Sequence, residues 1–261
     1  MSDHEEIASP IKAGERFRSG RVIGRMFSAM TANALFILPM AILLVAAPSS
    51  AMAYLTLLQQ DGQIGGLLQN LVVGLFAIFV QGVTIKACLD RFAGKRVRVG
   101  RSLGAGGGKY FGMFGVRWLT NLGTLFGLIL LIVPGLIWAT SWVVAGPALI
   151  GDDTGSQGPL ARSAQLTKGH RWPIFGLMLL FLLVYVVLAG LSGIVFYLCW
   201  RWIAPLTPWL KDSEQGAGIL ATPIVLALYE VFAAAGSASI YWELKLVREG
   251  GGADVVSRVF A

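Results

Sequence analysis

One carboxylate, Glu230, lies near the middle of a long apolar run at 219–247. An acidic side chain inside a hydrocarbon layer costs several kcal/mol unless it is protonated, paired or in contact with water. Two interpretations follow: a proton or cation relay lining a polar cavity, or a protonated carboxyl hydrogen-bonded to a neighbouring helix. The polar residues that we expect at a similar depth are Asn33, Gln81, Asn121 and Tyr229.

A second group that could do chemistry is basic and lies in a polar segment between two apolar runs. It consists of Arg162, Lys168, His170 and Arg171. Arg binds phosphate oxygens in pairs and Lys binds them as a point charge, so this group predicts a site for lipid phosphate headgroups. The alternative is topological anchoring, for which any basic residues on the inner face suffice.

A glycine run at 104–108 followed by Lys109 invites comparison with a phosphate-binding loop. The spacing does not fit, because that motif needs Gly at 103 and Ser or Thr at 110, where this chain has Leu103 and Tyr110. We expect residues 92–109 to form a flexible cytosolic loop instead. The sequence offers no Ser/His/Asp set, no pair of carboxylates at a shared site and no His/Cys ligand cluster, so we expect no enzyme activity, metal or cofactor.

The elements that position these residues are membrane helices. Of 261 residues, 56% are hydrophobic and 13% are charged, which is too apolar for a soluble domain. Nineteen of the 21 Lys and Arg residues fall in segments that can share one face, and Arg201 and Lys211 remain for the other. This positive-inside pattern predicts both termini in the cytosol and anionic lipids, not nucleic acid, as partners of the basic face.

We predict an all-α polytopic membrane bundle of about six transmembrane helices plus a short cytosolic amphipathic helix at 159–166. A cytosolic tail is expected at 1–25, the transmembrane domain at 26–249 and a second cytosolic tail at 250–261. Pro39 and Pro48 predict a kink or a local break in the first span. The predicted spans are 31–55, 64–88, 111–133, 136–150, 172–197 and 219–247.

Small residues predict where helices pack or stop. Gly123 and Gly127 form a GxxxG face for internal packing or for dimerisation, and Gly236 lies in a second small-residue tract. The apolar stretch from Phe111 is too long for one crossing, so we expect it to break at Pro134 and Gly135 in an outer-face turn.

Several short motifs occur in order around and beyond this break: Ile132–Gly135, Pro147–Ala148, Asp152, Gly155, Arg162–Ser163, Leu166–Trp172 and Tyr241–Lys245. Together they resemble the membrane domain found with glycerophosphoryl diester phosphodiesterases and the similar YciC-like inner-membrane proteins. The resemblance covers roughly residues 90–250 and implies a bundle of about six helices in a bacterial inner membrane. It extends to the membrane domain alone, because fewer than 90 residues follow Trp172 and the family's catalytic barrel has no room there.

From these features we expect a non-enzymatic, multi-pass protein of the inner (plasma) membrane that binds, senses or moves a lipid or amphiphile. The alternative is a scaffolding or assembly subunit that docks a partner complex or a second copy through the GxxxG face and the amphipathic helix. A third hypothesis, a small-solute or ion transporter, rests on Pro39, Pro134 and Glu230.

Overall fold

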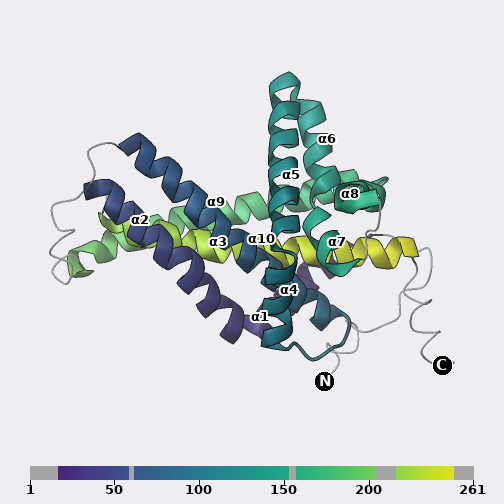
Figure 1. Ribbon diagram of the computed structural model, residues 1–261, viewed down its shortest axis with the longest axis horizontal. Coiled ribbons are helices and arrows are strands. Elements are labelled where there is room, and N and C mark those ends of the chain that lie inside the picture. Colours follow the sequence, from purple (N-terminus) through teal and green to yellow (C-terminus); the bar gives the residue numbers. More distant parts are fainter. Residues whose placement is uncertain (1–16, 59–61, 153–156, 204–215, 250–261) are drawn as a thin grey trace. The chain divides into compact units, whose positions relative to one another are not determined.

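The computed structural model describes residues 17–58, 62–152, 157–203 and 216–249, and within these ranges every regular element is a helix. Six stretches are long and apolar enough to cross a membrane: Ser19–Leu55, Leu68–Phe92, Tyr110–Leu130, Ile132–Gly151, Arg171–Leu198 and Ala221–Glu249. The expected all-α, multi-pass fold is therefore confirmed (Figure 1). The elements are α1 (Ser19–Ala41), η2 (Ile42–Ala46), α2 (Ala47–Leu58), α3 (Gly62–Phe92), α4 (Val99–Gly108), α5 (Tyr110–Leu130), α6 (Ile132–Trp142), α7 (Ala145–Gly151), α8 (Gly158–Thr167), α9 (Arg171–Ile203) and α10 (Gly216–Glu249).

The chain divides into two compact units, and the four long helices α1, α3, α9 and α10 each contribute a segment to both. Unit 1 comprises the described residues within Met1–Ala34, Gly82–Met178 and Ala234–Ala261. Unit 2 comprises those within Leu35–Gln81 and Leu179–Ala233. Each unit is described by itself below.

In unit 1, α5 and α6 form a tight antiparallel hairpin (Figure 1). A Cβ atom on Gly127 would lie 2.8 Å from the Gly135 Cα, and one on Gly123 would lie 2.4 Å from the Trp142 ring, so both glycines of the GxxxG face are used inside the hairpin. The predicted break at Pro134 and Gly135 is wrong by three residues, because the helix stops at Leu131, whose φ of −162° and ψ of 138° are extended. Pro134 instead occupies the first turn of α6, where its missing N–H costs no helical bond.

The predicted loop at 92–109 is also corrected, because most of it is the helix α4. Ser102 and Gly106 are its buried residues. A Cβ atom on Gly82 of α3 would lie 3.3 Å from the Gly106 Cα, so the two helices pack with glycine facing glycine. Tertiary packing thus overrides the low helix propensity of the glycine run.

The short helix α7 lies in the core of unit 1. A Cβ atom on Gly146 would lie 3.5 Å from the side chain of Ile85 on α3 and 3.4 Å from that of Met113 on α5. One on Gly151 would lie 3.1 Å from the ring of Tyr241 on α10. The predicted fourth span at 136–150 is therefore two helices, α6 and α7, separated at Val143 and Val144.

The predicted amphipathic helix is present as α8, and it is docked rather than free. The hydroxyls of Ser163 and Thr167 both donate to the carbonyl of Ser141 at the end of α6, at 2.7 and 3.3 Å. Both side chains are fully buried. Helix α1 begins at Ser19, seven residues before the expected start of the transmembrane domain, because Val22 is buried and its carbonyl accepts a bond from Ser239 of α10 at 2.7 Å.

In unit 2, the break predicted from Pro39 and Pro48 takes the form of a π-helical turn, η2, between α1 and α2. The Ala47 amide donates to the Ile42 carbonyl, five residues back, which widens the turn. The α9 segment of this unit is apolar and largely exposed, as a helix in contact with lipid should be: Leu182, Leu183, Val186, Val187 and Leu191 are each about half exposed.

Candidate functional site

Glu230 lies in the unit 2 segment of α10 and is 6% exposed. Its neighbour Tyr229 packs its ring against that of Tyr185 on α9, with 4.4 Å between ring centroids. Of the residues expected at its depth, Gln81 belongs to the same unit and is half-buried. The other two belong to unit 1: the Asn33 amide donates to the Ala29 carbonyl of its own helix at 2.8 Å, and Asn121 is exposed on α5.

Beside the Tyr185 and Tyr229 pair, unit 2 contains a groove between α9 and α10 with a volume of about 230 Å³. Its wall is mixed: four hydroxyl side chains, those of Tyr185, Ser192, Tyr197 and Thr222, stand among apolar groups. The Ser192 hydroxyl donates to the Ala189 carbonyl at 2.9 Å, which leaves its oxygen able to accept a bond. Sequence reasoning missed this groove, since it singled out Glu230, which does not line it. The remaining lining residues are Ala189, Gly193, Phe196, Ala221 and Val225.

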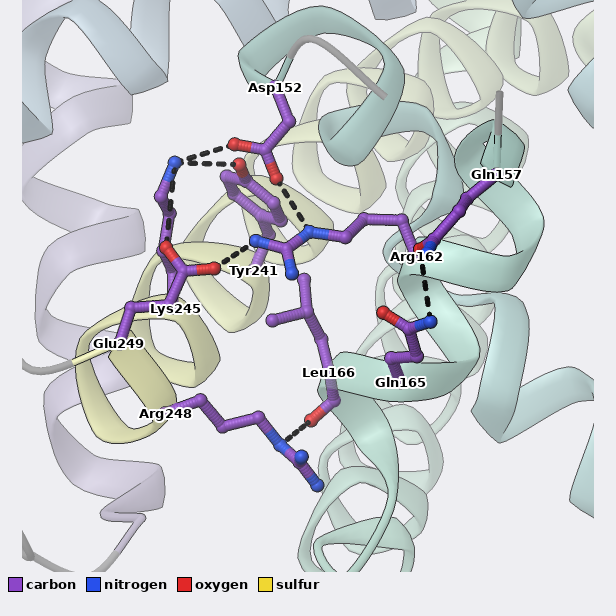
Figure 2. A network of polar contacts seen from close by, with 9 residues as sticks. All are labelled: Asp152, Gln157, Arg162, Gln165, Leu166, Tyr241, Lys245, Arg248 and Glu249. Carbon is purple, nitrogen blue, oxygen red and sulfur yellow. Dashed lines mark hydrogen bonds and ion pairs between the residues drawn. The ribbon is translucent and has the colours of Figure 1, made fainter. Parts of the chain in front are cut away.

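In unit 1, the first predicted headgroup residue, Arg162 of α8, is already ion-paired within the protein (Figure 2). Its guanidinium bonds Asp152 at 3.0 Å and also pairs with Glu249 at the end of α10. Lys245 of α10 bonds the second Asp152 oxygen at 2.5 Å and lies 3.9 Å from Glu249. We call Asp152, Arg162, Lys245 and Glu249 the ion-paired cluster; it has two acids and two bases and joins α8 and α10 to the end of α7.

Electrostatics in the ion-paired cluster favour the ionised forms. Burial opposes ionisation of Asp152, but bonds from Lys245, Tyr241 and Arg162 outweigh it and hold the pKa of that carboxyl below its usual value. Burial also disfavours the charge on Arg162, yet Glu249 and Asp152 raise its pKa above the ordinary arginine value. The cluster is therefore a stable ion pair at neutral pH rather than a proton donor or acceptor.

The other three predicted headgroup residues cluster at the turn between α8 and α9. Lys168 and Arg171 are exposed, and His170 is half-buried with its ring 5.8 Å from that of Phe17. Arg248 of α10 closes the end of α8 by donating to the carbonyls of Leu166, at 3.0 Å, and of Lys168. The structure thus leaves Lys168 and Arg171 facing outward and commits Arg162 to internal acids.

A second set of ion pairs, which sequence reasoning did not find, joins α1 to α10. Glu243 is completely buried and bonds Arg21 at 2.8 Å and Arg25 at 2.5 Å, and it also accepts the backbone amide of Arg18 at 3.3 Å. We call Arg21, Arg25 and Glu243 the α1–α10 clamp. The basic residues before the first apolar run indicated the inner face of the membrane. Their acidic partner Glu243 had no such signal in the sequence, because it lies more than 200 residues away in the chain. Gly236, the third predicted packing glycine, is buried on the same helix.

Within the described ranges, no three His, Cys, Asp or Glu side chains are grouped in a way that could hold a metal ion. Cys88 is buried, and the burial of Cys199 lies outside what the structure describes.

Comparison with known proteins gives one similarity. Residues 118–244 match a family described as "Domain of unknown function (DUF7847)". The match begins in α5 and ends in α10. It includes Asp152 and Arg162 of the ion-paired cluster, Glu243 of the clamp and all the residues that line the groove, and it ends just before Lys245. No curated protein and no solved structure matches this chain.

Proposed function

We propose that this chain is a non-enzymatic membrane protein that binds a lipid or other amphiphile in the groove between α9 and α10. The observation that carries the proposal is the mixed lining of that groove, in which hydroxyl groups stand among apolar side chains on two membrane-spanning helices. Such a wall suits a molecule with a hydrocarbon part and a polar linkage such as an ester or a carboxyl group.

The size of the groove suits only part of a lipid molecule. Its volume of about 230 Å³ is below the range of roughly 300–1,000 Å³ for sites that enclose a whole drug-sized ligand. We therefore propose that one hydrocarbon chain and its linkage enter the groove while the rest of the molecule stays among the surrounding lipids.

We further propose that the membrane is the inner (plasma) membrane of a bacterium, with both termini in the cytosol, on the positive-inside pattern of the chain. The resemblance to the glycerophosphoryl diester phosphodiesterase membrane domain is kept as a hypothesis for residues 90–250. The scaffolding alternative has less support, since Gly123 and Gly127 already pack within the hairpin and α8 is docked on α6.

The chain offers a matched pair of variants to test this proposal. Gly193 and Gly190 lie three residues apart on α9, both are exposed, and a Cβ atom on either meets nothing within 4 Å. Gly193 lines the groove and Gly190 does not. We expect Gly193→Phe to fill the groove and to abolish retention of a co-purified lipid in native mass spectrometry, while Gly190→Phe retains it. Equal retention by the two variants would contradict the proposal.

A further inference from the structure

Five basic residues lie within an 11-residue segment that runs from the last turn of α3 into the first turn of α4. All five side chains are exposed, and none makes a hydrogen bond or an ion pair within the described part of the chain. From Arg91 to Lys109 the sequence contains no Asp or Glu, and the preceding Asp90 is buried and paired with Lys86 at 2.8 Å. We call this set the open cation segment: Arg91, Lys95, Arg96, Arg98 and Arg101.

The backbone holds the open cation segment in a defined turn. Gly94 adopts a φ of 67°, a conformation that favours glycine, directly after the last turn of α3. Its amide donates to the Arg91 carbonyl at 3.0 Å, and the Lys95 amide donates to the Asp90 carbonyl at 2.8 Å. Beyond the turn, α4 is fixed to α3 by the glycine contact of Gly106 with Gly82. The cations are therefore displayed on an ordered surface, which lowers the entropic cost of binding.

The position of the open cation segment in the chain indicates what it contacts. One membrane-spanning stretch ends at Phe92 and the next begins at Tyr110, so the segment lies between two crossings at one face of the membrane. Three apolar side chains beside the cations are exposed as well: Val99 at 46%, Leu103 at 37% and Phe111 at 85%. A short helix that presents both basic and apolar side chains at the membrane boundary is suited to the headgroup layer.

We propose that the open cation segment, with α4, is a docking surface for anionic phospholipid headgroups of the surrounding bilayer. Five unpaired positive charges repel one another, and the phosphate groups that border the two spans are the nearest complementary partners. Of the headgroup residues predicted from the sequence, Arg162 is paired with Asp152 and Glu249, so the open cation segment is proposed as a separate surface from the one predicted at Lys168, His170 and Arg171. This surface goes beyond the α9–α10 groove, since the groove belongs to unit 2 and the segment to unit 1.

The test compares two double variants of the full-length chain: Arg96→Gln with Arg98→Gln, and the control Lys168→Gln with Arg171→Gln. Each removes two exposed cations, so any effect of net charge alone is equal. Binding is measured by native mass spectrometry in mixtures of phosphatidylglycerol and phosphatidylcholine. We expect the first variant to lose at least about fivefold in its preference for phosphatidylglycerol, because this is the attraction that a single basic residue contributes at an anionic surface. The control should lose clearly less.

Three further measurements keep the outcome interpretable. A reporter fused after Lys109 should show the same orientation for wild type and variant, so that a loss of lipid does not stem from inversion of the spans. The groove variant Gly193→Phe should keep its preference for phosphatidylglycerol, which separates failure of this proposal from failure of the groove. Any of three results would overturn the proposal: an unchanged preference in the Arg96 and Arg98 variant, an equal loss in the control, or binding of a single-stranded oligonucleotide in place of lipid.

Discussion

Unit 1 contains two sets of basic residues that the positive-inside pattern assigns to the same face and that differ in their partners in the folded chain. In the ion-paired cluster, Arg162 and Lys245 are neutralised by Asp152 and Glu249 (Figure 2). In the open cation segment, five cations face outward without a partner among the described residues. The difference separates paired charge, which joins helices, from unpaired charge, to which we assign the proposed headgroup contact.

The largest effect is expected where paired charge is most deeply buried, at Glu243 of the α1–α10 clamp. Glu243→Gln removes the counter-charge of Arg21 and Arg25, which are 22% and 11% exposed. We expect a loss of about 3 kcal/mol of stability, the lower end for breaking a buried ion pair because both arginines retain some solvent. Thermal unfolding in detergent measures it. The half-exposed Glu249→Gln is the control, and an equal loss in that variant would contradict the expectation.

A smaller loss is expected in the ion-paired cluster. Asp152→Asn removes the charge that Arg162 and Lys245 share, and we expect about 1.5 kcal/mol because both basic partners are partly exposed. The pKa of Asp152 is lowered in the fold, so its contribution is present above the ordinary aspartate pKa of about 3.9 and is lost as pH falls below that value. Melting temperatures of wild type and variant should differ by a constant amount between about pH 5 and 8 and converge below about pH 4. A constant difference down to pH 3 would argue against this origin.

The smallest effect on stability is expected in the open cation segment. Replacing Arg96 and Arg98 with Gln breaks no bond within the described chain, and it relieves some repulsion among five like charges. We expect the unfolding free energy to change by no more than about 0.5 kcal/mol, the usual range for surface positions. A clear drop in melting temperature in lipid-free detergent would mean that these cations have a structural role, and the distinction between the two regions would fail.

Much of this fold could be predicted from the sequence, because the length of an apolar run and the side on which Lys and Arg gather are local properties. Six spans and the helix α8 follow from them. Two features did not. The break at Leu131 has no sequence signal of its own, since the neighbouring Pro134 is tolerated in a first helical turn. Helix α4 forms from a glycine run that has low helix propensity, and the packing of α3 against it has no signal in the sequence.

The candidate sites were harder to predict, because they depend on partners that are distant in the chain. Nothing near Arg162 reveals that Glu249 neutralises it, and nothing near Arg21 reveals Glu243. Conversely, the sequence alone favours topological anchoring for the cations at 91–101. Only the structure shows that basic residues elsewhere are paired with acids and are therefore not available to a ligand. The groove could not be predicted because its lining residues come from two helices, and Ser192 and Thr222 belong to no sequence motif.

The turn of the α5–α6 hairpin has a chemical consequence. It reverses direction through a single residue, Leu131, and the stretch from Leu128 to Ile137 contains no amine, thiol, hydroxyl or carboxylate. Trypsin and reagents directed at amines, thiols, hydroxyls or carboxylates would therefore find nothing to cut or modify at this turn, and labelling with such reagents would not detect it.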